Sequence, residues 1–373
     1  MRMLDEALLE DVVVGSTVLG SGGGGDPYIG KLLARDAIRR FGPVPLYSLD
    51  ELAPDARIAS IAAFGAPGVL VEKLPRPADA VMALEALEAH LGYSFSHLVP
   101  IEAGGLNSVM PVPVAAQRGL PMVDADGMGR AWPTIDLVTP ALYGARATPL
   151  ALADEHANIF VLESRSSEWA EKICRAATVA SGCITLLALY PMSGQEAKKW
   201  LVDAPLARAA HLGHLVRTTR PRAAIAGRIV ADGGGVLLFE GNVTRVDRRT
   251  ERGWTMGTAT VSGTGGDSGR SLQLLFQNEY LVALRDNGDP PVSTPDLIMT
   301  LGLETGEPIP AEEIRYGFRV AVIGLPCDGR WRTEEGLRRS GPQRFGYDFD
   351  YVPVEETGAA SARVGSPLSA GTP

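Results

Sequence analysis

The stretch "LGSGGGGDPYIGKLL", residues 19–33, places four consecutive glycines, Gly22–Gly25, directly before Asp26 and Pro27. Asp is a preferred helix N-cap and Pro is favoured at the first helical position, so we expect a helix to begin at Pro27 and to stop at the next Gly-Pro pair. Upstream, apolar residues recur at helical spacing over residues 4–13. The sequence therefore predicts a helix, a glycine loop and a second helix.

Two nucleotide-binding motifs overlap this loop, and neither has its required context. Residues 20–25 match the dinucleotide fingerprint G-x-G-x-x-G, with Asp50 about 25 residues further on, but helical periodicity precedes them where the fingerprint needs a strand. Residues 25–31 match most of a phosphate-binding loop, but Leu32 stands where a Ser or Thr hydroxyl would hold magnesium. We therefore expect no nucleotide cofactor.

The glycines themselves favour a binding role for the loop. Glycine adopts backbone angles that are closed to other residues, and bare amides next to a helix N-terminus form a concavity rich in N–H donors. We expect Gly22, Gly23, Gly24 and Gly25, with Asp26 beside them, to bind a carbonyl or carboxylate of a small polar ligand. The alternative is a tight turn without a ligand, for which two glycines would be enough.

Composition describes an ordinary globular chain that is long enough for two domains. Of its 373 residues 45% are hydrophobic, and 35 Lys and Arg against 44 Asp and Glu give a net charge of −9. The sequence has no basic stripe, so we expect no nucleic-acid partner. The opening "MRMLDEALLEDVVV" has the pattern of neither a signal peptide nor a membrane span. We expect a cytoplasmic protein with no membrane partner.

The three cysteines, Cys174, Cys183 and Cys327, are too few and too scattered for a disulfide framework or a paired-cysteine zinc site. We expect them to be buried free thiols. Cys183 follows a predicted helix, where it could present a nucleophile, but the sequence identifies neither a base nor an orienting group for it.

Strand and helix signals divide the chain into three parts. Over residues 1–165, strand segments alternate with helical segments, which favours an α/β domain with a largely parallel sheet. Residues 166–354 begin with a helical connector and become β-rich from "RAAIAGRIVAD" onward, so we expect a sandwich or barrel-like domain there. Residues 355–373 have too little apolar content to pack, and we expect a disordered tail.

Polar side chains follow several predicted strands of the α/β domain, at the points where these strands end. Because the carboxyl ends of parallel strands meet at one edge of a sheet, we expect these side chains to converge on one site. Carboxylates gathered there suit acid–base work or a hard cation, whereas no zinc-ligand spacing is present. The residues concerned are Glu72 and Lys73, Glu102 and Asn107, and Asp124, Asp126 and Arg130.

Several of these segments together are similar to the S-methyl thiohydantoin desulfurase-like family, a former domain of unknown function described as related to hydantoinases and oxoprolinases. The resemblance rests on "LGSGGGGDPYIGKLL", "GAPGVLVEK", "IEAGGLNSVMPV", "VDADGMGRAWP" and "LYPMSG", and it extends over roughly residues 5–350. It implies an α/β N-terminal part and a β-rich C-terminal part. It also implies hydrolytic removal of methanethiol from the carbon between the two ring nitrogens of an S-methylated thiohydantoin, which leaves a hydantoin.

Hydrolysis at that carbon requires a base for the attacking water, a donor to the ring nitrogen and a polar cradle for the ring carbonyl. We expect either Asp124 or Glu102 to be the base. The base acts directly or through a water on one divalent metal, for which Glu72 and Asp126 are the candidate ligands. The residues expected to orient the substrate and to stabilise charge are Lys73, Arg130 and Asn107.

A second class of function stays open beside this hydrolase of hydantoin-like rings. Because the sequence has no clear nucleophile, it also fits a non-catalytic small-ligand-binding protein or an accessory subunit that works with a hydantoinase partner. Turnover of S-methyl thiohydantoins by the purified chain alone would separate the two classes. Exposed edges of the predicted sheets favour a homo-oligomer.

Overall fold

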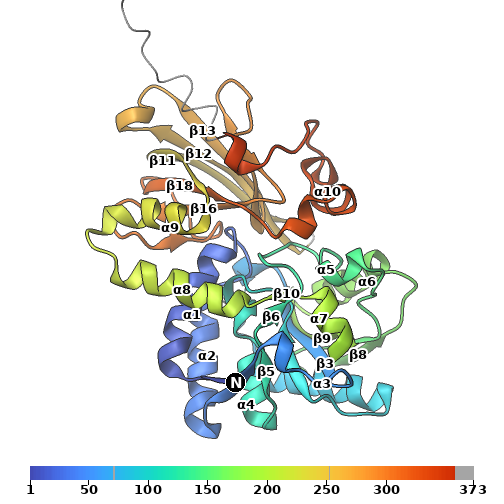
Figure 1. Ribbon diagram of the computed structural model, residues 1–373. Helices are drawn as coiled ribbons and strands as arrows, with labels where there is room; N and C mark the ends of the chain where they lie inside the picture. The colour runs from blue at the N-terminus through green and yellow to red at the C-terminus, as the bar shows by residue number, and fades with distance from the viewer. Residues whose placement is uncertain (70–71, 252, 358–373) are drawn as a thin grey trace, which may run out of the picture.

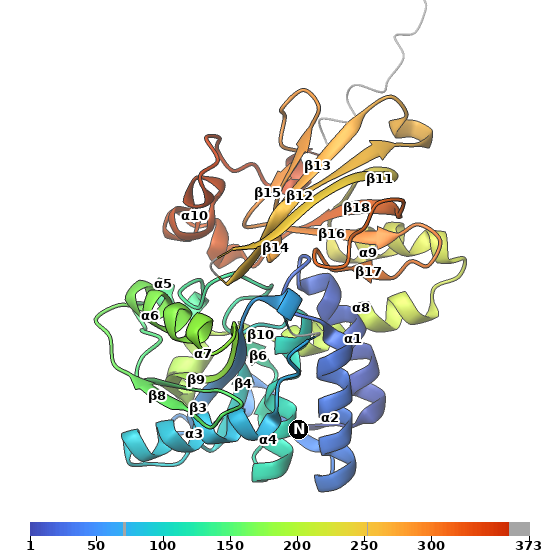
Figure 2. The same ribbon diagram turned by 180° about the vertical axis from the view of Figure 1, so that it is seen from behind.

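The computed structural model describes residues 1–69, 72–251 and 253–357, and it arranges them around two eight-stranded sheets. The first sheet and its helices form one unit, and the second sheet lies across one end of that unit (Figures 1 and 2). Most of the predicted disordered tail, residues 358–373, lies outside the described residues. Every helix within the described ranges is too short or too polar to cross a membrane.

The first unit alternates strands and helices along the chain. Its elements are β1 (Arg2–Leu4), α1 (Glu6–Leu19), α2 (Pro27–Phe41), β2 (Val44–Tyr47), β3 (Arg57–Gly65), α3 (Pro77–Leu91), β4 (His97–Pro100), α4 (Pro111–Arg118), β5 (Met122–Val123), β6 (Ala125–Asp126), α5 (Thr139–Leu142), β7 (Leu150–Ala153), β8 (Ile159–Leu162), α6 (Ser167–Ala180), β9 (Ile184–Ser193), α7 (Gly194–Trp200) and β10 (Val202–Asp203). The predicted helix, glycine loop and helix are confirmed as α1, residues 20–26 and α2.

The first sheet is mixed, which corrects the expectation of a largely parallel sheet. Its strand order is β1-β2-β5-β4-β3-β9-β7-β8. Only β2, β5, β4 and β3 run parallel to their neighbours within this group. A short turn joins β7 to β8 and makes them antiparallel, and β9 enters antiparallel between β3 and β7. Strand β9 follows residue 165 in the chain and nevertheless completes this sheet.

The second unit is β-rich, as expected, but its described strands form one open antiparallel sheet, which corrects the expectation of a sandwich or barrel. The strand order is β15-β14-β13-β12-β11-β18-β16-β17. Helix α8 leads into this unit and α10 follows its last strand. The elements are α8 (Pro205–Thr218), α9 (Ile225–Gly233), β11 (Val236–Glu251), β12 (Trp254–Gly263), β13 (Ser271–Gln277), β14 (Glu279–Arg285), β15 (Val292–Ser293), β16 (Leu297–Gly302), β17 (Pro308–Ile309), β18 (Arg319–Leu325) and α10 (Glu334–Ser340).

The segment "RAAIAGRIVAD" forms helix α9, so its assignment to the β-rich run is wrong. Ile225, Ala226 and Ile229 lie on one helical face and are all buried. This face packs against β11 and β18. The spacing of these three residues is helical, and it predicts the secondary structure here better than the β-branched residues of the segment do.

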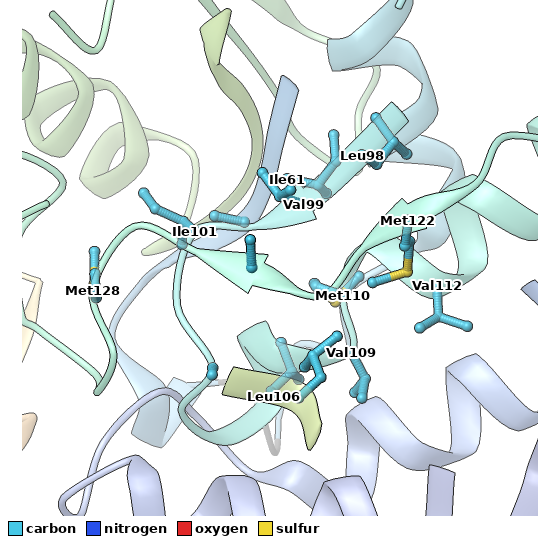
Figure 3. Packing of buried hydrophobic residues seen from close by; sticks show 14 of the residues in the cluster. Ile61, Leu98, Val99, Ile101, Leu106, Val109, Met110, Val112, Met122 and Met128 are labelled. Carbon is cyan, nitrogen blue, oxygen red and sulfur yellow. The ribbon is translucent and has the colours of Figure 1, made fainter. Parts of the chain in front are cut away.

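One hydrophobic core runs through both units. Leu98 and Ile101 of the first unit belong to the same buried cluster as Leu297, Met299 and Ile323 of the second sheet. Figure 3 shows the part of this cluster around β4 and the segment after it. The opposite face of the second sheet has a separate core. Since each fully buried aliphatic side chain contributes about 1.5–3 kcal/mol, the shared core fixes the two units against each other.

Helices α1 and α8 cross at direct backbone contact. A Cβ atom on Gly15 would lie 1.7 Å from the carbonyl oxygen of Ala209, and one on Gly213 would lie 1.8 Å from that of Asp11. Only glycine fits at these two positions. This crossing holds α1, and with it the start of the glycine loop, next to the chain that leads into the second unit.

We predict that Gly213→Ala lowers the free energy of unfolding by about 1–3 kcal/mol or more, because the added methyl group forces the two helices apart. Chemical denaturation measures this change. Gly227→Ala in α9 is the matched control, since its Cβ would meet nothing within 4 Å and alanine is the better helix former. Equal stability of the two variants would contradict the packing described for α1 and α8.

Candidate active site

Ser21, at the start of the glycine loop, is built into the second sheet. The Tyr280 N–H of β14 donates to the Ser21 carbonyl oxygen (2.7 Å). The Ile298 N–H of β16 donates to Ser21 Oγ (2.9 Å), which itself donates to the Ile298 carbonyl oxygen (3.0 Å). Strands β14 and β16 do not pair with each other in the sheet. The loop from the first unit therefore bridges two strands of the second.

The glycines let the backbone of this loop lie very close to residues of both units. A Cβ atom on Gly23 would lie 2.0 Å from Glu279 Oε1, and one on Gly24 would lie 2.3 Å from the Gly104 carbonyl oxygen. Gly24 also has a φ of +82°, which other residues rarely adopt. The loop is thus wedged between β14 of the second unit and the segment that follows β4.

The polar groups of the loop are used in two ways. The carbonyl oxygens of Gly24 and Gly25 accept the N–H groups of Asn107 (3.3 Å) and Leu106 (3.2 Å). The amides of Gly24 and Gly25 make no hydrogen bond within the described ranges. Asp26 caps α2 as predicted, because its carboxylate accepts the Tyr28 N–H (2.8 Å). The amides of Gly24 and Gly25 are thus available to a ligand, whereas the Gly23 N–H donates to the Gly20 carbonyl oxygen (2.8 Å) and the Asp26 side chain holds the helix.

A cavity of about 50 Å³ lies between the two units beside this loop. One water needs about 10–15 Å³, so the cavity holds a few waters or one compact ring. Both units contribute to its wall. Its polar or charged lining residues are Glu102, Asn107, Thr134, Arg175, Asn278 and Glu279, and the loop residues in contact with it are Gly24 and Gly25.

Glu102, one of the two predicted bases, lines the cavity just after β4. Its side chain is 3% exposed. Asn107 Nδ2 donates to Glu102 Oε1 (2.6 Å), and the Trp132 N–H donates to Oε2 (3.0 Å). Burial raises the pKa of Glu102 to about 8, against the effect of these two hydrogen bonds, which favour the carboxylate. Glu102 therefore changes charge close to neutral pH.

Asn107 is held in place by the neighbouring strand. Its Oδ1 accepts the Ala63 N–H (2.7 Å) and its Nδ2 donates to the Ala63 carbonyl oxygen (3.2 Å) as well as to Glu102. Both ends of the amide are thus fixed by β3, and the amide in turn fixes the direction of the Glu102 carboxyl group. The predicted role of Asn107 as a direct substrate ligand is left with few free hydrogen-bonding positions.

Glu279 brings a second carboxyl group to the cavity, from the first residue of β14. It is 2% exposed, and Oε2 has no hydrogen-bond partner in the described part of the chain. Burial and the nearby charge of Glu102 hold the pKa of Glu279 well above its usual range. Two carboxyl groups whose pKa values are raised by burial thus line one small cavity, and each comes from a different unit.

Arg130 lies behind this pair as a fully buried positive charge. Its guanidinium group lies 4.1 Å from the centre of the Trp132 ring. Burial lowers the pKa of Arg130 to about 10, against the attraction of Glu279 and other acidic groups. The backbone carbonyl oxygens that accept its hydrogen bonds, at 2.8–3.4 Å, are those of Ala131, Tyr280, Pro295 and Asp296. Arg130 therefore joins the two units while it supplies charge near the cavity.

Two predicted carboxylates serve as helix or loop caps outside the cavity lining. Asp124 accepts the N–H groups of Leu206 (2.8 Å) and Ala207 at the start of α8. Asp126 is buried, which raises its pKa to about 7. The amides that Asp126 accepts belong to Ala103, Met128 and Gly129. Asp126 thus anchors the backbone next to Glu102 but does not line the cavity.

The remaining predicted residues also lie apart from the cavity lining. Lys73 Nζ pairs with Glu155 Oε2 (2.7 Å) and donates to the Ser181 carbonyl oxygen. Glu72 is exposed. No group of three His, Cys, Asp or Glu side chains close enough to share a metal ion occurs in the described ranges. Both carboxylate oxygens of Asp126 accept backbone amides, and the divalent metal at Glu72 and Asp126 stays a prediction.

Sequence reasoning missed the second unit's contribution to this site. Glu279 lies in "SLQLLFQNEYLVAL", where the polar pair Asn278-Glu279 interrupts an apolar strand pattern. Asn278 has a φ of +59° and separates β13 from β14. This interruption could have indicated the site, since adjacent polar residues are unfavourable inside one continuous buried strand.

An α/β unit and a β-rich unit that enclose one polar cavity define a two-domain protein. Two family models match it, one described as S-Me-THD-like, N-terminal domain, over residues 7–164, and one described as S-Me-THD-like, C-terminal domain, over residues 165–354. The chain therefore belongs to the S-Me-THD-like family. The border between the two family models falls before α6 and β9, which pack into the first unit.

The fold is similar to the X-ray crystal structure of a protein from Chromobacterium violaceum. The two chains are 27% identical, the match covers 95% of this chain and 100% of that one, and the TM-score is 0.79. No curated protein matches this chain.

We predict that Glu279→Gln stabilises the protein increasingly as the pH rises. A carboxyl group whose pKa is raised in the folded state favours folding below its unfolded-state pKa, near 4.5, and this contribution is lost as the pH rises through the folded-state pKa. The difference in free energy of unfolding, variant minus parent, should therefore increase from pH 5 to pH 9. Denaturation from pH 5 to pH 9 measures it. A difference that does not change with pH would contradict the buried, protonated Glu279.

Proposed function

We propose that the protein is a hydrolase that acts on a small cyclic amide or amidine, such as an S-methyl thiohydantoin or a hydantoin, by means of an activated water. The observation that carries this proposal is the pair of buried carboxyl groups, Glu102 and Glu279, at one small cavity. Membership of the S-Me-THD-like family supports the substrate class. The pair replaces Asp124 as the proposed acid–base machinery, because Asp124 caps α8.

The environments of the two carboxyl groups assign their roles. Glu102 accepts two hydrogen bonds that stabilise the carboxylate, so it loses its proton first and is the general base. Glu279 has an oxygen without a partner and lies beside Glu102, so it keeps its proton and is the general acid. A base and an acid with separated pKa values are what hydrolysis of an amidine carbon requires.

In the first step Glu102 takes a proton from water while the water oxygen bonds to the carbon between the two ring nitrogens. The π electron pair of the C=N bond moves to nitrogen, which takes the proton of Glu279. The tetrahedral intermediate then carries one hydroxyl and one S-methyl group. Glu102 is now protonated and Glu279 is ionised. The charge of Arg130 stabilises the new carboxylate at Glu279, because it favours the ionised form of that group.

In the second step the C–S bond breaks and its electron pair leaves with sulfur, which takes the proton from Glu102. The hydroxyl proton of the intermediate passes to Glu279 as the C=O bond forms. The products are a hydantoin and methanethiol, and both carboxyl groups return to their starting states. The free amides of Gly24 and Gly25 are proposed to bind a carbonyl oxygen or carboxylate of the ligand.

We predict that Glu102→Gln and Glu279→Gln each lower kcat by about 10²–10⁴-fold, the usual contribution of one general acid or base. Thiol release from an S-methyl thiohydantoin by the purified chain measures this. Glu313→Gln is the control, because partial burial also raises the pKa of Glu313 but this residue does not line the cavity. We expect the control to keep normal activity.

Normal turnover in both cavity variants would contradict this assignment. If the parent chain binds the S-methyl thiohydantoin but releases no thiol, the second class of function, a ligand-binding or accessory subunit, replaces the hydrolase. The same preparation is therefore assayed for binding and for thiol release.

The pH dependence of kcat/KM is predicted to be bell-shaped. Activity needs Glu102 ionised, so it should rise with pH up to about 8, where this group titrates in the free protein. It should fall at higher pH as Glu279 loses its proton. These apparent pKa values belong to the coupled pair. Initial rates at low substrate concentration give the profile, and a maximum near pH 5 with a decline toward pH 8 would rule out Glu102 as the base.

A further inference from the structure

Two further polar groups at the cavity have no hydrogen-bond partner. Trp132 and Thr134 both line it. Trp132 Nε1 and Thr134 Oγ1 are buried and, within the described residues, unpartnered. Buried polar groups are nearly always hydrogen-bonded, and an indole N–H can only donate. The indole N–H therefore needs an acceptor from outside the chain, and the Thr134 hydroxyl is able to donate to the same acceptor.

A neighbouring tryptophan, Trp331, has its indole N–H paired within the fold. Trp331 packs edge-on against Trp132, with ring centres 5.6 Å apart. Its Nε1 donates to the Met128 carbonyl oxygen at 2.8 Å, so this equally buried indole is satisfied within the fold. The unsatisfied indole N–H of the pair is the one whose residue lines the cavity.

The segment that carries these donors is held rigidly. The Trp132 ring contacts the Arg130 guanidinium group, and it stacks with the Phe345 ring at a centre distance of 6.1 Å. The Pro133 carbonyl oxygen accepts Arg175 Nη2 (3.0 Å) and Trp254 Nε1 (3.0 Å). Contacts from both units thus fix the segment, and fixed donors lose little freedom when an acceptor arrives.

The same segment is attached to the proposed base. The Trp132 backbone N–H donates to Glu102 Oε2, so the position of the donors and that of the carboxyl group are linked by one residue. The cavity holds no more than one compact ring. An acceptor on that ring, held by Trp132 and Thr134, would lie in the same small cavity as the Glu102 carboxyl group.

We propose that Trp132 Nε1 and Thr134 Oγ1 together bind a ring carbonyl oxygen of the ligand and that this carbonyl determines specificity. The substrate class is then a five-membered ring that has a carbonyl group next to the reacting N–C–N unit. A ring without this carbonyl leaves both donors unpaired in a buried site, and such sites discriminate strongly against the poorer analogue. This inference rests on the proposed function for the location of the reacting carbon.

The test measures binding and not turnover. Isothermal calorimetry compares hydantoin with imidazolidin-2-one, which keeps the N–C–N unit and lacks the second carbonyl. We expect hydantoin to bind at least about tenfold more tightly to the parent chain. Trp132→Phe and Thr134→Val should each weaken hydantoin about fivefold to tenfold and leave imidazolidin-2-one nearly unchanged. Trp331→Phe is the matched control and should keep the full preference.

Equal affinity of the parent for both rings, no detectable binding of hydantoin, or an unchanged preference in Trp132→Phe would overturn the inference. Circular dichroism of each variant verifies that it is folded, and Thr134→Val gives an independent answer if Trp132→Phe is not. The thiol-release assay reports on the proposed function separately. A chain that prefers hydantoin but releases no thiol would keep the recognition role and lose the hydrolase.

Discussion

The structure depends on the close packing of the glycine loop. The loop contacts strands β14 and β16 of the second sheet on one side and the segment after β4 on the other. Ser21 bonds to strands β14 and β16 of the second sheet, while Gly23 and Gly24 approach Glu279 and the Gly104 backbone more closely than any side chain would allow. A Cβ atom at Gly23 would collide with the Glu279 side chain of the second unit, and one at Gly24 would collide with the Gly104 backbone of the first unit. The glycine run therefore joins the two units, and its free amides at the cavity are a consequence of where this junction lies.

The junction also creates the electrostatic character of the site. Glu102 comes from the first unit and Glu279 from the second, and both are removed from water once the shared core has formed. Burial of two carboxyl groups opposes folding unless they keep a proton. The fold compensates through the hydrogen bonds to Glu102 and through the buried charge of Arg130. A proton held at this pair near neutral pH is the property that suits it to hydrolytic chemistry.

Sequence reasoning predicted the local features and missed the long-range ones. Asp26 and Pro27 signal the start of α2 directly, and Glu102 was a candidate because it follows a strand. The direction of β9 could not be predicted, since the pattern of a buried apolar strand is the same for parallel and antiparallel pairing. The partners of Asp124 could not be predicted either, because the helix that it caps is distant in the sequence. Glu279 was missed because its partner lies far away in the chain. Only the shared core brings the two together.

The central claim is that the carboxyl pair of Glu102 and Glu279 retains a proton at neutral pH. Infrared difference spectroscopy of the parent minus Glu279→Gln at pH 7 tests this most directly, because a protonated carboxyl group has a C=O band that a carboxylate lacks. We expect the difference spectrum to keep one protonated-carboxyl band, that of Glu279, which fades only at alkaline pH. A difference spectrum that contains carboxylate bands alone at pH 7 would contradict the account.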